Sequence, residues 1–457
     1  MPSNTVLGGV FMTDIDGNLS NSSFVSSENV CGIIFDTKIV GGMAKALTGA
    51  AAELFANGNV VEFSDIKEVN EAGLENVMYG LPYLHISQFF ALAGTNQRLF
   101  VSFTDSSIDT NFECIERMQL VANGLIYQIG LWTGEPFATT TESGDYQVIN
   151  NGILAKCQAQ AETLGGKIGV TNYEGNSPVN ILISAPVLDA AVCDYQRLPD
   201  LTALDFPKVS VLLGQGSSDE IHDIQFRINT SGETPNYAIV GCVGAALGIL
   251  AIASAEQSMA WVRNFNLSKV MTQCELGFGN LAVKSDMSDW ENTLSFTNIK
   301  TLGYTKRNNF LHRKGYIFLR DHEGRENGVY FSSDQTLSTG DYRRISRCRV
   351  MHKSRRVVRL ALLPYIEQSV EIDVSTGYIA TADLAMIQNV VYDALDRNMV
   401  QPASPQTPQI SGRQVVIDPK QNVLENDQLL ISYALVPKGI TSAIFVTEGF
   451  AATVGNS

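Results

Sequence analysis

Side chains that bind metals or attack substrates are sparse in this chain, and their spacing suits neither role. The seven cysteines, at positions 31, 114, 157, 193, 242, 274 and 348, include no Cys-x-x-Cys pair. The five histidines, at positions 85, 222, 312, 322 and 352, lack metal-ligand spacing. We therefore expect free, mostly buried thiols in a reducing cytoplasm, and no bound metal or other cofactor.

The best sequence sign of catalysis is the segment Thr13–Leu19, TDIDGNL, which follows the apolar run Val10–Met12. It resembles the Asp-x-Asp-Gly-Thr-Leu signature of haloacid-dehalogenase-type phosphatases. That resemblance makes Asp14 the nucleophile and Asp16 the acid and base. Asn18 replaces the signature threonine, and an ordinary aspartate- and glycine-rich turn has the same composition. A soluble phosphatase using Asp14 and Asp16 is the alternative function.

Charge is distributed unevenly along the chain. Its 457 residues carry a net charge of −15, which argues against a general nucleic-acid binder. Residues 306–359 nevertheless hold 14 lysines and arginines against 5 aspartates and glutamates, and such a basic block is typical of a docking surface. Only 17% of all residues are charged. That low share fits either an apolar-rich enzyme or a surface buried against copies of the same chain.

The arginines of the basic block belong to a predicted helix with Asp341 as its N-cap. Apolar residues recur along one stripe of this helix, and the cations lie away from it. The stripe comprises Ile345, Cys348, Met351, Val358 and Leu362, and the cations include Arg344, Arg347, Lys353 and Arg356. The pattern predicts either a solvated charged face or a surface attracted to an acidic partner.

Strand-like and helix-like runs alternate before the basic block, which indicates βαβ units and a mainly parallel sheet. The predicted strands are residues 31–36, 98–103, 125–131, 180–184 and 209–213, and the predicted helices include 44–58, 112–122 and 146–164. Two more apolar runs, Tyr316–Leu319 and Val329–Phe331, precede the basic helix, and a second helix is expected over Asp383–Met399. The predicted fold class is therefore α/β, or α+β overall.

The uncharged stretch Tyr237–Ala255 contains the small-residue pair Gly244 and Gly248. Its 19 residues are long enough for a transmembrane helix, which would make the protein membrane-tethered. However, no cluster of lysine or arginine flanks it, and Glu256 follows directly. Such small residues also suit a helix packed closely inside a large core, which we expect here. The first residues lack the features of a signal peptide.

From Gly315 onward the chain resembles the C-terminal half of contractile tail sheath proteins, which form the sleeve around the tube of contractile-tailed bacteriophages and related injection machines. The resemblance rests on GYIFLR, GVYF and DYRRI and on the order of the following helices, linker and strands, over roughly residues 301–450. It implies a sheath-type C-terminal α/β domain with a mixed sheet, an upstream α/β body, and an extended arm at each end. The corresponding ranges are 301–440 for the domain, 21–300 for the body (lobes of about 21–205 and 206–300), and 1–20 and 441–457 for the arms.

In that family, each arm adds a strand to a sheet in a neighbouring subunit. The resemblance implies arm contacts through Val6, Val10, Phe11, Ile444, Phe445 and Val446, and a receiving sheet that includes Leu429, Ile431, Tyr433 and Leu435. It also implies that Arg343, Arg344, Arg347, Lys353 and Arg356 face the tube. An internal hairpin between residues 428–436 and 441–449 is the alternative for the C-terminal end.

The resemblance implies a structural, non-enzymatic function. Copies of the chain would form a helical homo-oligomer of stacked rings and contract without a cofactor, driving the tube through a cell envelope. The implied partners are further copies, the inner tail tube protein, and baseplate and tail terminator proteins, without direct contact to nucleic acid or membrane. The implied location is the virion, as part of a phage tail assembled in the host cytoplasm. An extracellular injection particle remains open.

Overall fold

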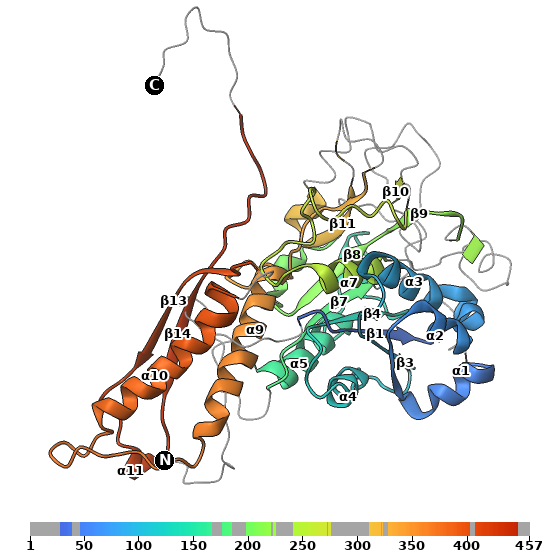
Figure 1. Ribbon diagram of the computed structural model, residues 1–457. Helices are drawn as coiled ribbons and strands as arrows, with labels where there is room; N and C mark the ends of the chain where they lie inside the picture. The colour runs from blue at the N-terminus through green and yellow to red at the C-terminus, as the bar shows by residue number, and fades with distance from the viewer. Residues whose placement is uncertain are drawn as a thin grey trace, which may run out of the picture.

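The computed structural model combines one large sheet, with helices on both faces, and a smaller part built from helices and a two-stranded sheet (Figure 1). This mixture confirms the predicted α/β fold class. The structure describes residues 28–38, 46–166, 176–184, 198–220, 223–224, 241–271, 273–275, 310–320, 322, 328–402 and 407–446.

The large sheet has eight strands in the order β12-β11-β8-β7-β4-β1-β3-β2. Its six central strands run parallel, and β2 and β12 pair antiparallel at the two edges. The strands are β1 Cys31–Asp36, β2 Val60–Phe63, β3 Leu99–Thr104, β4 Gln128–Trp132, β7 Asn180–Ser184, β8 Val209–Leu213, β11 Tyr316–Arg320 and β12 Tyr330–Phe331. The mainly parallel sheet predicted from the alternation is thus confirmed.

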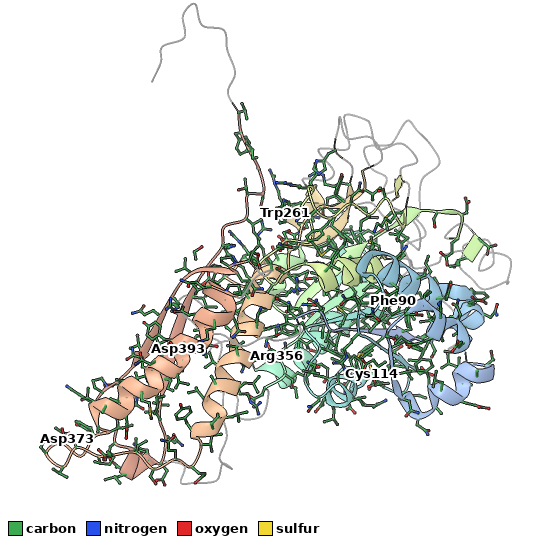
Figure 2. The ribbon with its side chains drawn as sticks, in the orientation of Figure 1. Phe90, Cys114, Trp261, Arg356, Asp373 and Asp393 are labelled. Atoms are coloured by element: carbon green, nitrogen blue, oxygen red, sulfur yellow. The ribbon has the colours of Figure 1, made fainter. Side chains whose placement is uncertain are left out.

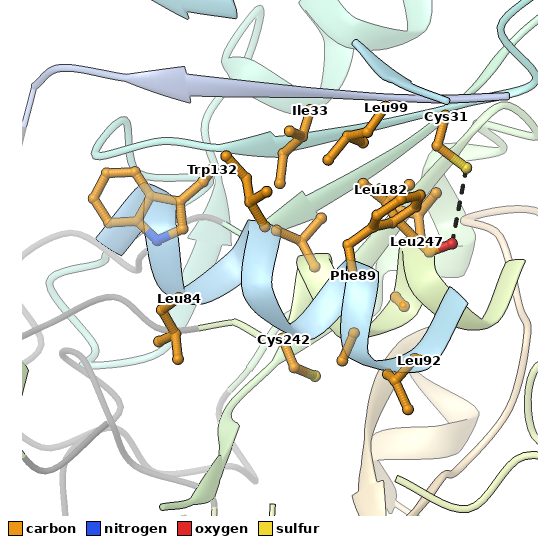
Figure 3. Close-up of a cluster of buried hydrophobic side chains, with 14 of the residues drawn as sticks. Cys31, Ile33, Leu84, Phe89, Leu92, Leu99, Trp132, Leu182, Cys242 and Leu247 are labelled. Atoms are coloured by element: carbon orange, nitrogen blue, oxygen red, sulfur yellow. Dashed lines mark hydrogen bonds between the residues drawn. The ribbon is translucent and has the colours of Figure 1, made fainter. Parts of the chain in front are cut away.

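Both faces of the central strands are buried, which is why the sequence shows continuous apolar runs there. In β1, Ile33 and Phe35 belong to one core cluster and Ile34 to the other. Helices α3 (Leu81–Ala93) and α7 (Val243–Ile252) contribute to the first cluster, as Figure 3 shows for Phe89 and Leu247. Helices α4 (Cys114–Val121) and α5 (Ile153–Gly165) contribute to the second.

Helix α7 covers part of the stretch considered as a membrane helix. A Cβ atom on Gly244 would lie 2.1 Å from the carbonyl oxygen of His85 in α3, and one on Gly248 would lie 2.9 Å from that of Phe89. The small residues therefore allow two buried helices to approach closely, as expected for a packed core. Among the residues that the structure describes, no helix has the length and apolar character needed to cross a bilayer.

One predicted helix begins later than expected. Residues Tyr146–Val148 form β6, which pairs antiparallel with β5 (Ala138–Thr140), and the helix begins only at Ile153.

The part of the molecule built around the large sheet also contains several short elements. They are α1 Gly49–Leu54, α2 Ile66–Glu71, β9 Gln215–Ser217, β10 Gln273–Glu275 and 3-10 turns at 56–58, 74–80 and 201–204.

The smaller part has its own apolar core. Helix α9 (Ile345–Leu362) lies between the large sheet and α10 (Thr381–Leu395), and α10 ends in a π turn, Asp396–Val400 (Figure 1). Strands β13 (Ile410–Ile417) and β14 (Ile431–Pro437) pair antiparallel, with α11 (Val423–Asn426) between them in sequence. Val358, Val391, Leu395, Val415 and Leu435 belong to the shared core.

The large sheet crosses the predicted domain boundary at residue 300. Strand β11 pairs in parallel with β8, so Phe318 lies beside Leu213. A division at this residue would separate hydrogen-bonded neighbours, because β8 precedes the boundary and β11 follows it. The residue ranges of the domains stay a prediction.

Candidate assembly surface

The two-stranded sheet presents one face to α10 and the other to solvent. Leu435 is buried against the core, and Ile431 and Tyr433 are half-buried on the same face. Val416 and Val436 alternate with these positions and are exposed. Leu429 precedes β14 and is half-buried. Three of the four residues predicted for a receiving sheet therefore lie on β14 and support its packing onto α10.

The two long edges of this sheet differ. At the β13 edge, the backbone oxygen of Val415 accepts a hydrogen bond from Gln388 Nε2 at 2.9 Å, and its N–H points to the Tyr392 hydroxyl at 3.4 Å. Both partners come from α10, so this helix covers the β13 edge at its middle. In the described part of the chain, β14 has β13 as its single strand neighbour. The outer edge of β14 is thus the better candidate for an added strand.

Ser442 accepts a hydrogen bond from Arg344 at the start of α9, and from there the C-terminal segment extends away from the body of the molecule (Figure 1). Its apolar side chains are almost fully exposed: Ile444 by 80%, Phe445 by 95% and Val446 by 80%. Among the described residues, the segment pairs with no strand, β14 included. Residues 441–446 therefore do not form the internal hairpin considered as an alternative. Thr447 and the residues after it lie outside the described part.

The N-terminal candidates lie outside the described residues. They are Val6, Val10 and Phe11 of the predicted arm and Asp14 and Asp16 of the phosphatase alternative.

Two of the five cations predicted to face a tube are instead buried. Only 1% of the Lys353 side chain is exposed, and Arg356 is buried as well. Arg344 and Arg347 are half-buried, and Arg343 is exposed. The alternative of a solvated face does not hold for the middle of α9, because the sheet body covers Arg355 and Arg356. Figure 2 shows Arg356 between the large sheet and the smaller part.

The buried guanidinium groups of α9 bind backbone carbonyl oxygens. Arg349 Nη2 donates to Leu250 and Ala253, both at 2.9 Å, at the end of α7. Arg355 donates to the carbonyl of Gly165 at the end of α5. The last carbonyls of a helix lack intrahelical partners and carry the negative end of its dipole. Two helices of the sheet body therefore end on cations from α9.

Arg356 connects the two loops that lead into the neighbouring central strands β4 and β7. Its Nη2 atom lies 2.9 Å from the Gly124 oxygen, 2.7 Å from that of Ile126 and 2.9 Å from that of Pro178. The guanidinium carbon also lies 3.9 Å from the centre of the Tyr127 ring, a cation–π arrangement. Burial is the main cause that lowers the pKa of Arg356, and of Arg349, below the usual arginine value. The sequence pattern pointed to neither role, because backbone carbonyls leave no signature in side-chain types.

The predicted N-cap of α9 was also wrong. Arg344, not Asp341, precedes the first helical residue, and its side chain makes no capping bond. The first backbone N–H groups instead reach Asp334: Ile345 N lies 2.7 Å from its backbone oxygen, and Ser346 N 3.4 Å from its carboxylate. A buried aspartate from a preceding loop therefore caps the helix, and Arg344 pairs with the same carboxylate.

The described residues contain no group of three or more His, Cys, Asp or Glu side chains that could hold a metal ion. Cys31, Cys114, Cys157, Cys242 and Cys348 are free and buried, as expected. Burial raises the pKa of the Cys31 and Cys242 thiols to about 12, which leaves them protonated and poorly nucleophilic at neutral pH. Burial likewise lowers the pKa of His85 to about 3.

Comparisons with known proteins agree with this geometry. Residues 341–454 match the family "DUF2586, C-terminal domain", and no curated protein matches the sequence. The chain is similar in structure to the contracted helical sheath of the anti-feeding prophage, with 12% identity, a TM-score of 0.50 and coverage of 99% of this chain and 100% of that one. A chain of the anti-feeding prophage baseplate is also similar in structure, with 11% identity, a TM-score of 0.50 and coverage of 98% of this chain and 99% of that one. The contracted PVC sheath of an extracellular contractile injection system has 9% identity and a TM-score of 0.49, with coverage of 99% of both chains. The likeness to the anti-feeding prophage sheath shows a sheath-like fold along nearly the whole length of the chain.

Proposed function

We propose that this chain is the structural subunit of a contractile sheath, which polymerises around an inner tube and contracts to drive that tube through a cell envelope. The sheath-like fold supports this proposal. The observation that carries it is the exposed apolar segment Ile444–Val446, which has no partner strand within the described part of its own molecule. In water such a segment is costly to leave uncovered, so a second copy is its natural partner.

The segment is suited to β-augmentation at the outer edge of β14 in a neighbouring copy. A donated strand of about five residues makes about four to six backbone hydrogen bonds, each worth about 0.5–1.5 kcal/mol net. Burying the Phe445 side chain adds about 1.5–3 kcal/mol. One arm is therefore a modest tether, and the tether becomes strong only when every subunit of the sleeve provides one.

The energy for contraction would be stored during assembly and released when the subunit bodies repack, without a nucleotide. The partners in this proposal are further copies of the chain, the inner tube protein, and baseplate and terminator proteins. Of the cations first expected at the tube, Lys353 and Arg356 are buried and Arg344 is paired with Asp334, which leaves Arg343 and Arg347 as the suitable ones. Screened contacts of this kind contribute less than about 1 kcal/mol each, which suits a grip that must break during contraction.

The preferred location is a phage tail assembled in the host cytoplasm. A single chain with an arm at each end fits that assembly, because one gene product then supplies both strand contacts. An extracellular injection particle would use the same subunit chemistry.

Negative-stain electron microscopy of the purified full chain tests the proposal. We expect tubes or other high-mass polymers without added cofactor, and folded but unpolymerised protein after deletion of residues 441–457. The variant Phe445→Ser should weaken assembly in the same way. Val374→Ser is a matched control, because Val374 is also fully exposed but lies in a loop of the smaller part. Polymers that form equally well without residues 441–457 would contradict the role of the C-terminal arm.

A further inference from the structure

The side chain of Glu28 lies where four distant parts of the chain meet. Its Oε1 atom accepts hydrogen bonds from Lys353 Nζ in α9 at 2.9 Å and from Gln409 Nε2 at 2.8 Å. Its backbone oxygen accepts from Arg349 Nη2 at 3.3 Å, and Arg349 also holds the end of α7. All four side chains are buried.

Glu28 and Gln409 lie near opposite ends of the chain. Glu28 lies three residues before the first residue of β1, and the first 27 residues precede it in the chain. Gln409 immediately precedes β13, and the C-terminal hairpin follows it. One hydrogen bond to the Glu28 carboxylate thus joins residues 381 positions apart in sequence. The two cations that contact Glu28, Arg349 and Lys353, are one turn apart on the same face of α9.

We infer that Glu28 couples the two ends of the chain, so that a pull on either the N-terminal segment or the C-terminal hairpin is transmitted to the other through a single buried junction on α9. This inference rests on the proposed function, in which both ends are held by neighbouring copies. The physical reason is that a buried, charge-assisted junction resists opening at one side alone. Withdrawing Gln409 removes a donor from a buried carboxylate, and withdrawing Glu28 leaves Lys353 as an unpaired buried cation.

Hydrogen exchange on the unassembled full chain tests the coupling. Two amides report on the two ends: Cys31 N, which is bonded to the Arg98 oxygen, and Gln409 N, which is bonded to the Met399 oxygen. Glu28→Gln keeps the size and an acceptor but removes the charge. We expect it to accelerate exchange of Gln409 N by about tenfold or more, the change expected from loss of one charge-assisted bond. Gln409→Met should accelerate exchange of Cys31 N, because it removes the side-chain hydrogen bond to Glu28, three residues before Cys31.

Asp334→Asn is the matched control. Asp334 is also a buried carboxylate and binds the start of the same helix through Ser346, but its hydrogen bonds reach neither Glu28 nor Gln409. It should lower overall stability and change the exchange of the two reporter amides no more than that of the central strands. The same uniform change in Glu28→Gln, or unchanged Cys31 N in Gln409→Met, would overturn the coupling. If Glu28→Gln does not fold, the Gln409→Met result decides alone.

A second measurement uses sedimented polymers. In the wild type, assembly should slow exchange at both reporter amides together. In Gln409→Met, slowing of exchange at one reporter amide should no longer be accompanied by slowing at the other. The inference would also be overturned if wild-type polymers and Gln409→Met polymers slowed exchange at the two reporter amides to the same extent. If the wild type forms no polymers, the proposed function fails, and the experiment on unassembled protein still decides the coupling.

Discussion

The large sheet and helix α9 are both buried, but they are stabilised by opposite kinds of side chain. In the sheet, apolar residues such as Ile33 and Leu182 fill two cores, and the free energy comes mainly from area removed from water. In α9, Arg349, Arg355 and Arg356 are buried against backbone carbonyls. A core of the first kind tolerates small shifts of its contacts, whereas one of the second kind depends on a few directional bonds.

This difference suits a subunit that must keep its body intact while its connections move. The cations of α9 fix the sheet body to the smaller part, which carries the hairpin and the C-terminal segment. Four substitutions or conditions test the comparison, and they follow in order of their expected effect on the free energy of unfolding, with the effect of acid taken per pH unit.

Arg349→Ala should have the largest effect. It leaves the carbonyls of Leu250 and Ala253 without their donor and opens a cavity in a fully buried site. We expect a loss of about 3–5 kcal/mol, because buried acceptors lose their donor and a cavity is left behind, measured by urea unfolding. Arg343→Ala is the control, since Arg343 is exposed and should change stability by less than about 0.5 kcal/mol. Equal effects of the two variants would remove the distinction between the regions.

Gly244→Ala tests the apolar region by overpacking. The added Cβ would meet the backbone of α3 at the His85 carbonyl, which cannot rotate away, so we expect a loss of about 1–3 kcal/mol. Calorimetry of the variant measures it. Alanine favours a helix by about 1 kcal/mol over glycine, so a gain in stability would show that α3 and α7 pack less closely than described. Gly439→Ala is the control, because its Cβ would meet no atom within 4 Å.

Acid should weaken the sheet region through His85. Burial lowers the pKa of His85 in the folded protein to about 3, below its unfolded value of about 6.5. The unfolded chain therefore binds the proton first, and stability falls as pH decreases from about 6.5 toward 3, by about 1.4 kcal/mol per pH unit. Urea unfolding of His85→Leu should show a shallower pH slope than the wild type, and Val374→Ser should keep the wild-type slope. An unchanged slope in His85→Leu would argue that His85 is protonated when folded.

Phe445→Ser should have the smallest effect on folding. The side chain is 95% exposed, so the unassembled protein should lose less than about 0.5 kcal/mol. Analytical ultracentrifugation should nevertheless show a large loss of association. A marked decrease in melting temperature of the unassembled protein would mean that Phe445 packs against its own molecule.

The apolar region was largely predictable from sequence. Runs such as NILIS and VSVLL became β7 and β8 because strands buried on both faces must be apolar throughout. The error at residues 146–152 arose because Tyr146–Val148 pairs with Ala138–Thr140, and this local pairing overrides helical periodicity. Gly152 then marks the true start of α5.

The cationic region was not predictable in the same way. A run of arginines looks the same whether water or backbone carbonyls surround it, and the carbonyls of residues 124, 126 and 165 are identical in every sequence. Asp334 escaped notice as a cap because it lies eleven residues before Ile345. The C-terminal segment Ile444–Val446 is apolar in sequence and exposed in the fold, and its role as a donated strand stays a prediction.

The pairing of β8 with β11 has a consequence for the newly made chain. Strand β8 ends at Leu213, and its neighbour begins only at Tyr316. During translation, the ribosome therefore adds about a hundred residues before β11 can pair with the open edge of β8. An open edge of this kind is prone to aggregation, so nascent chains should need chaperone protection most during that interval.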